Sequence, residues 1–464
     1  MTSMVLQHDA LQSQVSGRTA GREELEQRYR PLFREDFSYR QLVTYVPNKS
    51  LPIHRWFKYP QGYSPQLVER ILTRFNAIPA TDIVLDPFAG CGTTMLAAKQ
   101  LGYQSWGLDR LPTSVFVASV KLRDATEYDL VALKRQIEYL LTLPYHEPSI
   151  TAPTDIRIVR LAYTPQTLDE VMFFREVIEQ VSDRLVQDFL MFALMAVLES
   201  VSFTSKDGQF LRLVERTIPP VREVLAKQLH RMYGDLSGAY RQTGFFDTPV
   251  APARADVYLG DARDLSLFQR RTDVVITSPP YLNRYDYTRI FGLELCLRDC
   301  RQLRDVVALR HSLLRSHIES KDAPTRDVNH PALEEVLDNL AGERLNNDRI
   351  PIMVRGYFED MNRVIEQLYA VSNPGAYVAL VVGNARFHGE LIPVDLLLCE
   401  LAVAAGFSVD EIIVTRYKGN SSQQMGRFGR VPVRESILFW SKPAFVTTIQ
   451  SFHHNHKGYL AFRA

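Results

Sequence analysis

The chain has 464 residues, of which 46% are hydrophobic and 23% charged, an ordinary composition for a folded globular protein. Its 54 basic and 53 acidic residues leave a net charge of +1, which excludes a uniformly basic nucleic-acid-binding surface and requires any such surface to be local. The length indicates two or three domains, or one domain with large insertions.

The N-terminal residues 1–25 are polar and lack the apolar core of a secretory signal, so we expect a mobile tail. The longest apolar run, residues 189–198, is too short to span a bilayer and predicts a buried helix. Four cysteines, at positions 91, 296, 300 and 399, fit a reducing compartment and complete no metal-ligand set. We therefore expect a cytoplasmic protein with no membrane segment and no metal site.

The first dense pattern begins at Ser64-Pro65, which predicts the start of a helix with an apolar stripe. Residues 81–109 then predict a strand, a glycine turn, a helix, a second turn and another strand. This βαβ unit implies parallel strands.

Two helical insertions interrupt the strands that follow. Residues 125–250 predict a helical insertion, and residues 291–349 predict a charge-rich helical insertion that is a candidate target-recognition region. The sheet-forming residues 26–124, 251–290 and 350–445 then make one α/β catalytic domain. Its seven expected strands lie at 83–86, 104–109, 255–260, 272–277, 376–383, 409–416 and 434–440. The last two strands follow each other without a helix and should pair antiparallel.

The glycine turn "DPFAGCGTT" spans residues 86–94, at the end of the first of these strands. Ligands of open α/β sheets bind at this end of the strands, and Gly90 and Gly92 would let the backbone approach one closely. The alternative is a tight turn that needs glycine for its geometry alone. A dinucleotide fingerprint would need a third glycine where Met95 stands, and no P-loop lysine follows. An adenosine-type ligand without a pyrophosphate fits best, and a nicotinamide oxidoreductase is disfavoured.

Acidic residues occur at the ends of three successive strands: Asp86, Asp109 and Asp261. Each alone could be a solvated residue or a helix cap. Asp109 is placed to accept hydrogen bonds from ribose hydroxyls, and Asp261 to accept one from an adenine amine. Together the three favour a ligand site.

The strand at 272–277 runs directly into Ser278, Pro279, Pro280 and Tyr281. Two prolines leave no amide hydrogen to continue a ladder, so the simplest alternative is a structural turn. However, "DPFAGCGTT", "GLD" (107–109), "GDARDL" (260–265) and "TSPPY" (277–281) resemble, in this order, the motifs of amino-group DNA methyltransferases of the TSPPY type. The segment "FKYPQGYSPQLVERIL" (57–72) resembles a further motif of that family less closely.

The resemblance implies a Rossmann-like methyltransferase sheet of seven strands and S-adenosylmethionine as the cofactor. It places Asp86 and residues 88–92 at the methionine and sulfonium end, Asp109 at the ribose and Asp261 at the adenine. With their neighbours, the expected cofactor-binding residues are Asp86, Pro87, Phe88, Ala89, Gly90, Cys91, Gly92, Thr93, Thr94, Asp109, Asp261 and Ala262.

The same resemblance makes Ser278, Pro279, Pro280 and Tyr281 the expected catalytic residues. An exocyclic base amine is a poor nucleophile, and two acceptors aimed at its N–H bonds make its lone pair available. The Pro279 carbonyl and Ser278 Oγ can serve as these acceptors, while Tyr281 can stack on a base flipped out of double-stranded DNA.

A serine before the prolines usually accompanies cytosine-N4 methylation in this family, so we expect that reaction, with a cognate restriction endonuclease as a candidate partner. Adenine-N6 methylation, an RNA substrate and a non-catalytic S-adenosylmethionine- or nucleic-acid-binding protein are the alternatives.

Two locally basic stretches are candidates for holding the nucleic acid. Residues 284–315 contain seven arginines, which could also form intrahelical pairs. Residues 416–434 hold five cations, no acid before Glu435 and several amides, the side chains that contact phosphates and base edges. The expected nucleic-acid-binding residues here are Arg416, Lys418, Asn420, Gln423, Gln424, Arg427 and Arg430.

Overall fold

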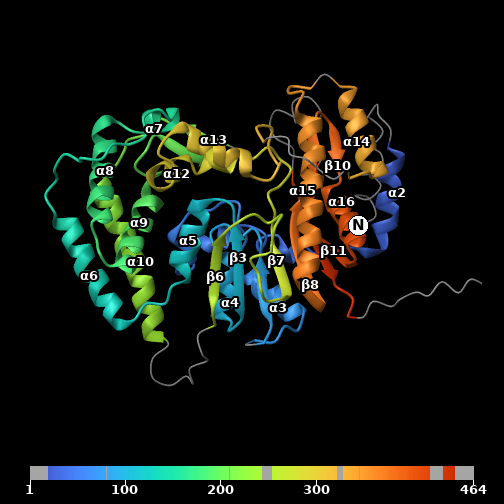
Figure 1. The fold of residues 1–464 in the computed structure, drawn as a ribbon, viewed down its shortest axis with the longest axis horizontal. Coiled ribbons are helices and arrows are strands. Elements are labelled where there is room, and N and C mark those ends of the chain that lie inside the picture. Colours follow the sequence, from blue (N-terminus) through green and yellow to red (C-terminus); the bar gives the residue numbers. More distant parts are fainter. Residues whose placement is uncertain are drawn as a thin grey trace, which may run out of the picture.

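The computed structural model describes residues 19–79, 81–207, 210–242, 253–320, 328–343, 345–418 and 432–444. Its centre is one eight-stranded sheet in the order β1-β11-β12-β8-β7-β2-β3-β6 (Figure 1). The strands are β1 (Phe33–Glu35), β2 (Ile83–Asp86), β3 (Gln104–Asp109), β6 (Ala255–Leu259), β7 (Thr272–Thr277), β8 (Ser372–Gly383), β11 (Ser408–Lys418) and β12 (Val433–Ser441). Strand β12 runs antiparallel to both neighbours, and the other pairings are parallel.

The expected α/β sheet and its antiparallel strand are confirmed. The eighth strand, β1, is an addition that the sequence did not indicate. It has only three residues, pairs in parallel with the edge of β11 and buries none of its side chains fully, so no apolar alternation marks it.

Helices cover both faces of the sheet because alternate residues of each strand point to opposite sides. Val274 and Ile276 of β7 pack with α3 (Pro65–Arg74), whereas Val275 packs with α15 (Ile350–Val371) on the other face. The remaining helices next to the sheet are α4 (Thr93–Gln100), α5 (Pro112–Leu122) and α16 (Val394–Ala405), while α2 (Ala20–Tyr29) packs on α16 and α14 (Pro331–Ala341) packs on α15 and α2. Short 3-10 turns lie at Arg30–Leu32, Phe37–Tyr39, Val46–Lys49 and His54–Trp56.

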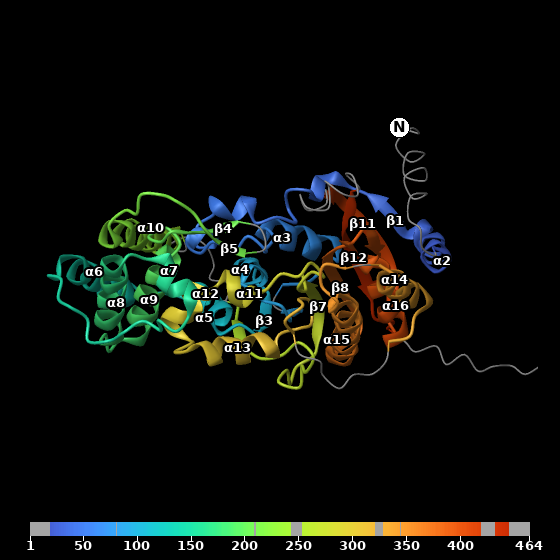
Figure 2. The ribbon, with the colours of Figure 1, turned by 90° about the horizontal axis from the view of Figure 1, so that it is seen from above.

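The first insertion forms one end of the molecule, at the left of Figure 1 and again in the view from above (Figure 2). It contains α6 (Glu127–Thr142), α7 (Arg157–Ala162), α8 (Pro165–Glu179), α9 (Arg184–Val197) and α10 (Val221–Gln242). Within α9, the apolar run is buried as expected. The insertion is not wholly helical, since β4 (Thr204–Asp207) and β5 (Phe210–Leu213) form an antiparallel hairpin inside it.

The second insertion begins with α11 (Tyr287–Ile290), α12 (Gly292–Arg298) and α13 (Leu303–Ser312) and continues to α14. It is joined to the first insertion by a buried ion pair between Lys206 of β4 and Glu294 of α12, whose side chains are 4% and 2% exposed. Glu294 therefore pairs across the two insertions. A last hairpin, β9 (Ala385–Phe387) with β10 (Glu390–Ile392), precedes α16.

The expected mobile tail is wrong for residues 20–25, which form the first turns of α2 and bury Leu25. The Gly21 amide and the Arg22 Nε each donate a 2.6 Å hydrogen bond to the carboxylate of Glu335 on α14. This partner lies more than 300 residues away in the chain, so local polarity could not reveal it. Residues 1–18 lie outside the described part of the chain. Among the described helices, none has both the length and the apolar character of a membrane span.

Candidate active site

The carboxyl ends of β2, β3, β6 and β7 surround one pocket, at the point where the chain reverses its direction of travel across the sheet. The pocket holds about 920 Å³ of empty space, part of it open to solvent. Of the predicted residues, it is lined by Asp86, Pro87, Phe88, Ala89, Gly90, Cys91, Thr93, Asp109, Asp261, Ala262, Ser278 and Pro280.

The glycine turn connects β2 to α4, and both of its glycines have left-handed backbones, with φ of 51° at Gly90 and 84° at Gly92. A Cβ on Gly92 would lie 2.8 Å from the Cβ of Ala118 on α5, and one on Gly90 would lie 3.0 Å from the ring of Tyr59. An added Cβ would therefore meet protein atoms at both positions, although the Gly90 backbone lines the pocket. The structure supports the geometric explanation for these two glycines.

Asp86 is the centre of this turn and is only 2% exposed. Its Oδ1 accepts hydrogen bonds from the Phe88 amide (3.0 Å) and from Thr277 Oγ1 (2.6 Å), and its Oδ2 from Thr94 Oγ1 (2.6 Å) and Tyr63 Oη (3.1 Å). Burial raises the pKa of Asp86 above its usual value. These four donors make Asp86 the link that fixes the turn against the end of β7, where Ser278 begins.

Asp109 ends β3 and faces the same pocket. Its Oδ2 accepts a 2.8 Å hydrogen bond from the Gly90 amide and its Oδ1 a 2.9 Å bond from the Leu111 amide. Burial raises the pKa of Asp109 to about 6, although both amides favour the charged form. Each oxygen keeps a further acceptor position, so the carboxylate can still receive two hydroxyl donors from a ligand.

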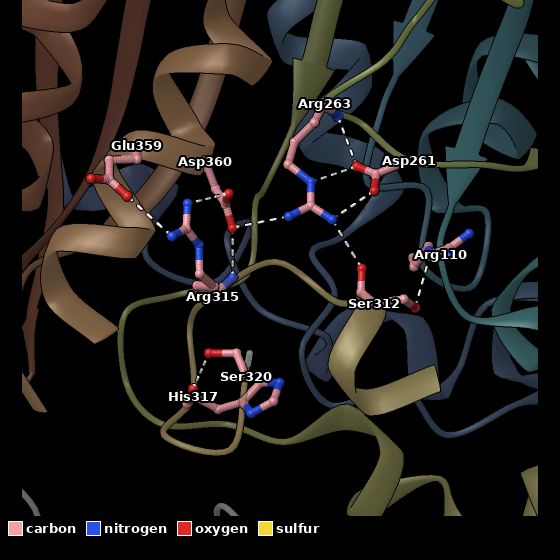
Figure 3. A network of polar contacts seen from close by, with 9 residues as sticks. All are labelled: Arg110, Asp261, Arg263, Ser312, Arg315, His317, Ser320, Glu359 and Asp360. Atoms are coloured by element: carbon pink, nitrogen blue, oxygen red, sulfur yellow. Dashed lines mark hydrogen bonds and ion pairs between the residues drawn. The ribbon is translucent and has the colours of Figure 1, made fainter. Parts of the chain in front are cut away.

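Asp261 follows β6 and is held by Arg263, as Figure 3 shows. Arg263 Nε donates to Oδ1 of Asp261 at 2.9 Å and Nη2 to Oδ2 at 2.7 Å. Burial alone would raise the pKa of Asp261, but the hydrogen bonds and charge of Arg263 outweigh it and hold the pKa below its usual value. The carboxylate is therefore a fixed, ionised acceptor at this end of the pocket.

The same arginine joins Asp261 to a buried ionic network on α15 (Figure 3). Arg263 Nη1 donates to Asp360 at 3.2 Å, and Asp360 also accepts from the backbone amide of Arg315 at 2.9 Å and from its Nη2 at 2.8 Å. Arg315 Nη1 lies 3.0 Å from Glu359. A Cβ on Gly356 would come within 2.9 Å of Arg315 Cδ. The lack of a side chain at this glycine therefore leaves room for the Arg315 side chain to cross α15.

Asp360 thus anchors the segment that follows α13, and this segment brings Leu313, Leu314 and Ser316 to the pocket. Sequence reasoning missed these residues because nothing in a charge-rich insertion marks them. It also left unassigned Tyr59, Gln61, Gly62 and Tyr63, although the segment 57–72 that contains them had a weak motif resemblance. The other unassigned lining residues are Leu108, Arg110, Leu111 and Tyr287.

Tyr281 ends the Ser-Pro-Pro-Tyr motif and contacts strands β8 and β12. Its Oη donates a 3.0 Å hydrogen bond to Glu435, and a Cβ on Gly383 would lie 3.1 Å from its ring. Pro279 and Tyr281 are not among the residues lining this pocket, whereas Ser278 and Pro280 are. Gly92 and Thr94 do not line the pocket either. Gly92 lies against Ala118, and Thr94 Oγ1 donates a hydrogen bond to Asp86. The motif therefore lies between this pocket and the ends of β8 and β12, which Tyr281 contacts.

Comparison with known proteins identifies the family of the chain. A family model described as DNA methylase matches residues 14–117. The chain is 34% identical over 453 residues to the type II methyltransferase M.AvaI of Nostoc sp. (strain PCC 7120), covering 90% of this chain and 92% of the relative. The chain belongs to the type II DNA methyltransferases. M.BsoBI of Geobacillus stearothermophilus, another type II methyltransferase, is 32% identical over 466 residues, covering 87% of this chain and 88% of that one.

The amino-methyltransferase resemblance is thus confirmed, and the methyltransferase uses S-adenosylmethionine. Among solved structures, the rRNA methyltransferase aviRa from Streptomyces viridochromogenes overlaps 88% of this chain and 94% of its own, with 13% identity and a TM-score of 0.30. That overlap is too loose to carry an argument.

Two of the cations expected to hold nucleic acid are paired inside the methyltransferase. Arg416 Nε and Lys418 Nζ both contact the carboxylate of Glu435, which is 1% exposed. Asn420, Gln423, Gln424, Arg427 and Arg430 lie outside the described residues. In the other basic stretch, Arg310 pairs with Asp286 and Arg315 with Asp360. Several of the described cations in these two stretches are therefore balanced by acids from other segments of the fold.

One group of potential metal ligands occurs in the described part of the methyltransferase: Asp286, His317 and Glu319, whose ligand atoms lie within 4.8 Å of one another. Two arginines already neutralise its carboxylates. Arg310 Nε lies 2.7 Å from Asp286 Oδ2, and Arg289 Nη2 lies 2.5 Å from Glu319 Oε1. A cation placed there would meet two guanidinium groups at close range, which is unfavourable.

Proposed function

We propose that the methyltransferase methylates the exocyclic N4 amine of cytosine in double-stranded DNA, as the modifying enzyme of a restriction-modification system. One observation carries this proposal: Ser278 and Pro280 line the pocket that Asp109 and Asp261 also line. A base amine held by the motif would then lie beside the reactive end of the cofactor. The serine before the prolines favours cytosine through the family resemblance.

The residues that line the pocket fit the cofactor by their chemistry. Asp109 would hold the ribose hydroxyls, Asp261 and Ala262 the adenine, and the backbone of Phe88 to Cys91 the methionine end. When bound, S-adenosylmethionine supplies an electrophilic methyl group on its sulfonium. The ionised, Arg263-fixed carboxylate of Asp261 suits an amine donor.

The residues of the motif would activate the amine without a covalent intermediate. Ser278 Oγ and the Pro279 carbonyl accept from its two N–H groups and stabilise the charge that develops on nitrogen. Thr277 is fixed to Asp86, so the first acceptor is positioned rigidly against the cofactor turn. Tyr281 provides the flat surface on which the extruded base stacks, which offsets the free energy of unpairing.

A test of these roles uses purified protein, methyl-labelled S-adenosylmethionine and genomic DNA from a host without base methylation. Tyr281→Ala should lower the turnover number at least about fivefold, since base–aromatic stacking contributes about 1–3 kcal/mol, and leave the cofactor dissociation constant unchanged. Tyr128→Ala, a matched change at a 78% exposed tyrosine of α6, should change neither quantity. Full activity of Tyr281→Ala would refute the stacking role.

The labelled product also separates the alternatives. Label in N6-methyladenine would identify adenine as the target base, and label only in added RNA would identify RNA as the substrate. Absence of any labelled nucleoside, with intact cofactor binding, would favour a non-catalytic protein. A cognate endonuclease is tested separately, by asking whether DNA methylated by this enzyme resists cleavage in an extract of its native host.

A further inference from the structure

We propose that Glu435 is a positioning residue that sets the orientation of Tyr281, with Arg416 and Lys418 as its counter-ions rather than as free DNA contacts. The inference rests on the stacking role proposed above for Tyr281. Glu435 does not itself touch the substrate or the cofactor in this interpretation; it acts through the tyrosine.

The geometry begins with the register of three neighbouring strands. Glu435 of β12 lies opposite Gly383 of β8 on one side and opposite Arg416 of β11 on the other. Gly383 has no side chain to occupy the space above the sheet, and the ring of Tyr281 uses that space, 3.1 Å from where a Cβ would stand. The ring thereby comes within reach of the Glu435 carboxylate.

The second element is the hydrogen bond itself. Tyr281 Oη donates to Glu435 Oε1 at 3.0 Å. Burial, together with the charge of Glu435, holds the pKa of the Tyr281 phenol well above its usual value, so the phenol keeps its proton and remains a donor. A tyrosine fixed at its hydroxyl end as well as at Cβ cannot swing, and its ring face stays in one plane.

The third element is the neutralisation of Glu435. A 1% exposed carboxylate is costly unless cations surround it, and Arg416 Nε and Lys418 Nζ both contact it. Lys418 Nζ also lies 5.3 Å from the centre of the Tyr281 ring. The two cations that a sequence would assign to phosphates therefore complete the support of the tyrosine.

The test is a double-mutant cycle between Tyr281→Phe and Glu435→Ala, with single-turnover methyl transfer as the readout. Each single change should slow transfer about tenfold, as expected for loss of a hydrogen bond to a charged group. Because both remove the same hydrogen bond, the double variant should be no slower than the slower single variant. Dissociation constants for S-adenosylmethionine should stay within twofold of the unmodified protein.

Two further variants separate positioning from a general structural effect. Glu435→Gln keeps an acceptor for the tyrosine and should recover at least half of the rate lost in Glu435→Ala, even if the alanine variant folds poorly. Glu411→Ala, in the same strand pair, removes a carboxylate that also contacts two arginines, Arg34 and Arg74. It should leave the transfer rate unchanged.

Two results would overturn the role of Glu435: multiplicative losses in the cycle, or a Glu435→Ala rate equal to that of the unmodified protein while Tyr281→Phe is slow. Either result would leave the proposed function intact. A fully active Tyr281→Ala would instead refute the stacking role on which this inference rests.

Discussion

The most specific prediction concerns the pH dependence of cofactor binding through Asp109. Burial raises the pKa of this carboxyl to about 6, against an ordinary value of 3.8. Ribose hydroxyls need the ionised form as their acceptor, and that form falls to roughly one tenth of the protein at pH 5. The dissociation constant for S-adenosylmethionine should therefore be flat above pH 7 and rise about tenfold by pH 5. Asp109→Asn should bind more weakly and show no such rise.

The stability of the cofactor-free protein should respond in the opposite direction. Because folding raises the pKa, protonation of Asp109 stabilises the folded state at low pH, and this stabilisation is lost as the pH rises through about 6. At pH 7 the ionised, buried carboxylate costs ~3 kcal/mol, and at pH 5 under ~2 kcal/mol. The free energy of unfolding of Asp109→Asn should therefore exceed that of the unmodified protein by less at pH 5 than at pH 7.

Isothermal titration between pH 5 and 7.5 measures the first effect, and urea unfolding over the same range measures the second. Both are taken as differences between the unmodified protein and Asp109→Asn, because other carboxylates also titrate there. A flat cofactor affinity in the unmodified protein, or an equal rise in Asp109→Asn, would refute the assignment of Asp109 to the ribose.

Three other changes test the packing around the site. Gly92→Ala should destabilise the fold by at least ~2 kcal/mol in urea unfolding, because φ is 84° and the new Cβ would lie 2.8 Å from that of Ala118; a change below about 0.5 kcal/mol would contradict this. Lys206→Met should lower the free energy of unfolding by about 3–5 kcal/mol, because it leaves Glu294 buried without its partner. Adding Glu294→Leu should restore most of this stability. No recovery in the double variant would show that the loss of the ion pair does not cause the destabilisation. Asp360→Asn should weaken cofactor binding about tenfold, since it loosens both Arg263 and the segment after α13; unchanged affinity would remove that segment from the cofactor site.

The sequence predicted the sheet and the grouping of the polar residues at the strand ends well, for a physical reason. Strand ends and tight turns are encoded locally, so Asp86, Asp109, Asp261 and Ser278 could be placed at one sheet edge from alternation and glycine positions alone. The structure gathers all four around one pocket.

The unpredicted features depend on contacts between distant parts of the chain. Arg416 was assigned to DNA because its local sequence is basic, but its partner Glu435 follows a connection whose course the sequence does not give. Arg22 likewise pairs with Glu335 and Glu390, over 300 residues away, which is why a polar tail turned out to be a helix from Ala20. Charge that is unbalanced in a sequence window can be balanced in the fold.

The central claim, methylation of the cytosine N4 amine in DNA, has one direct measurement. The chain is expressed in a host that lacks base methylation, and the digested DNA is analysed by nucleoside mass spectrometry beside DNA from cells carrying the Tyr281→Ala variant. The expected result is N4-methylcytosine in the first sample and at least about fivefold less of it in the second. N6-methyladenine without N4-methylcytosine in the first sample would contradict the claim.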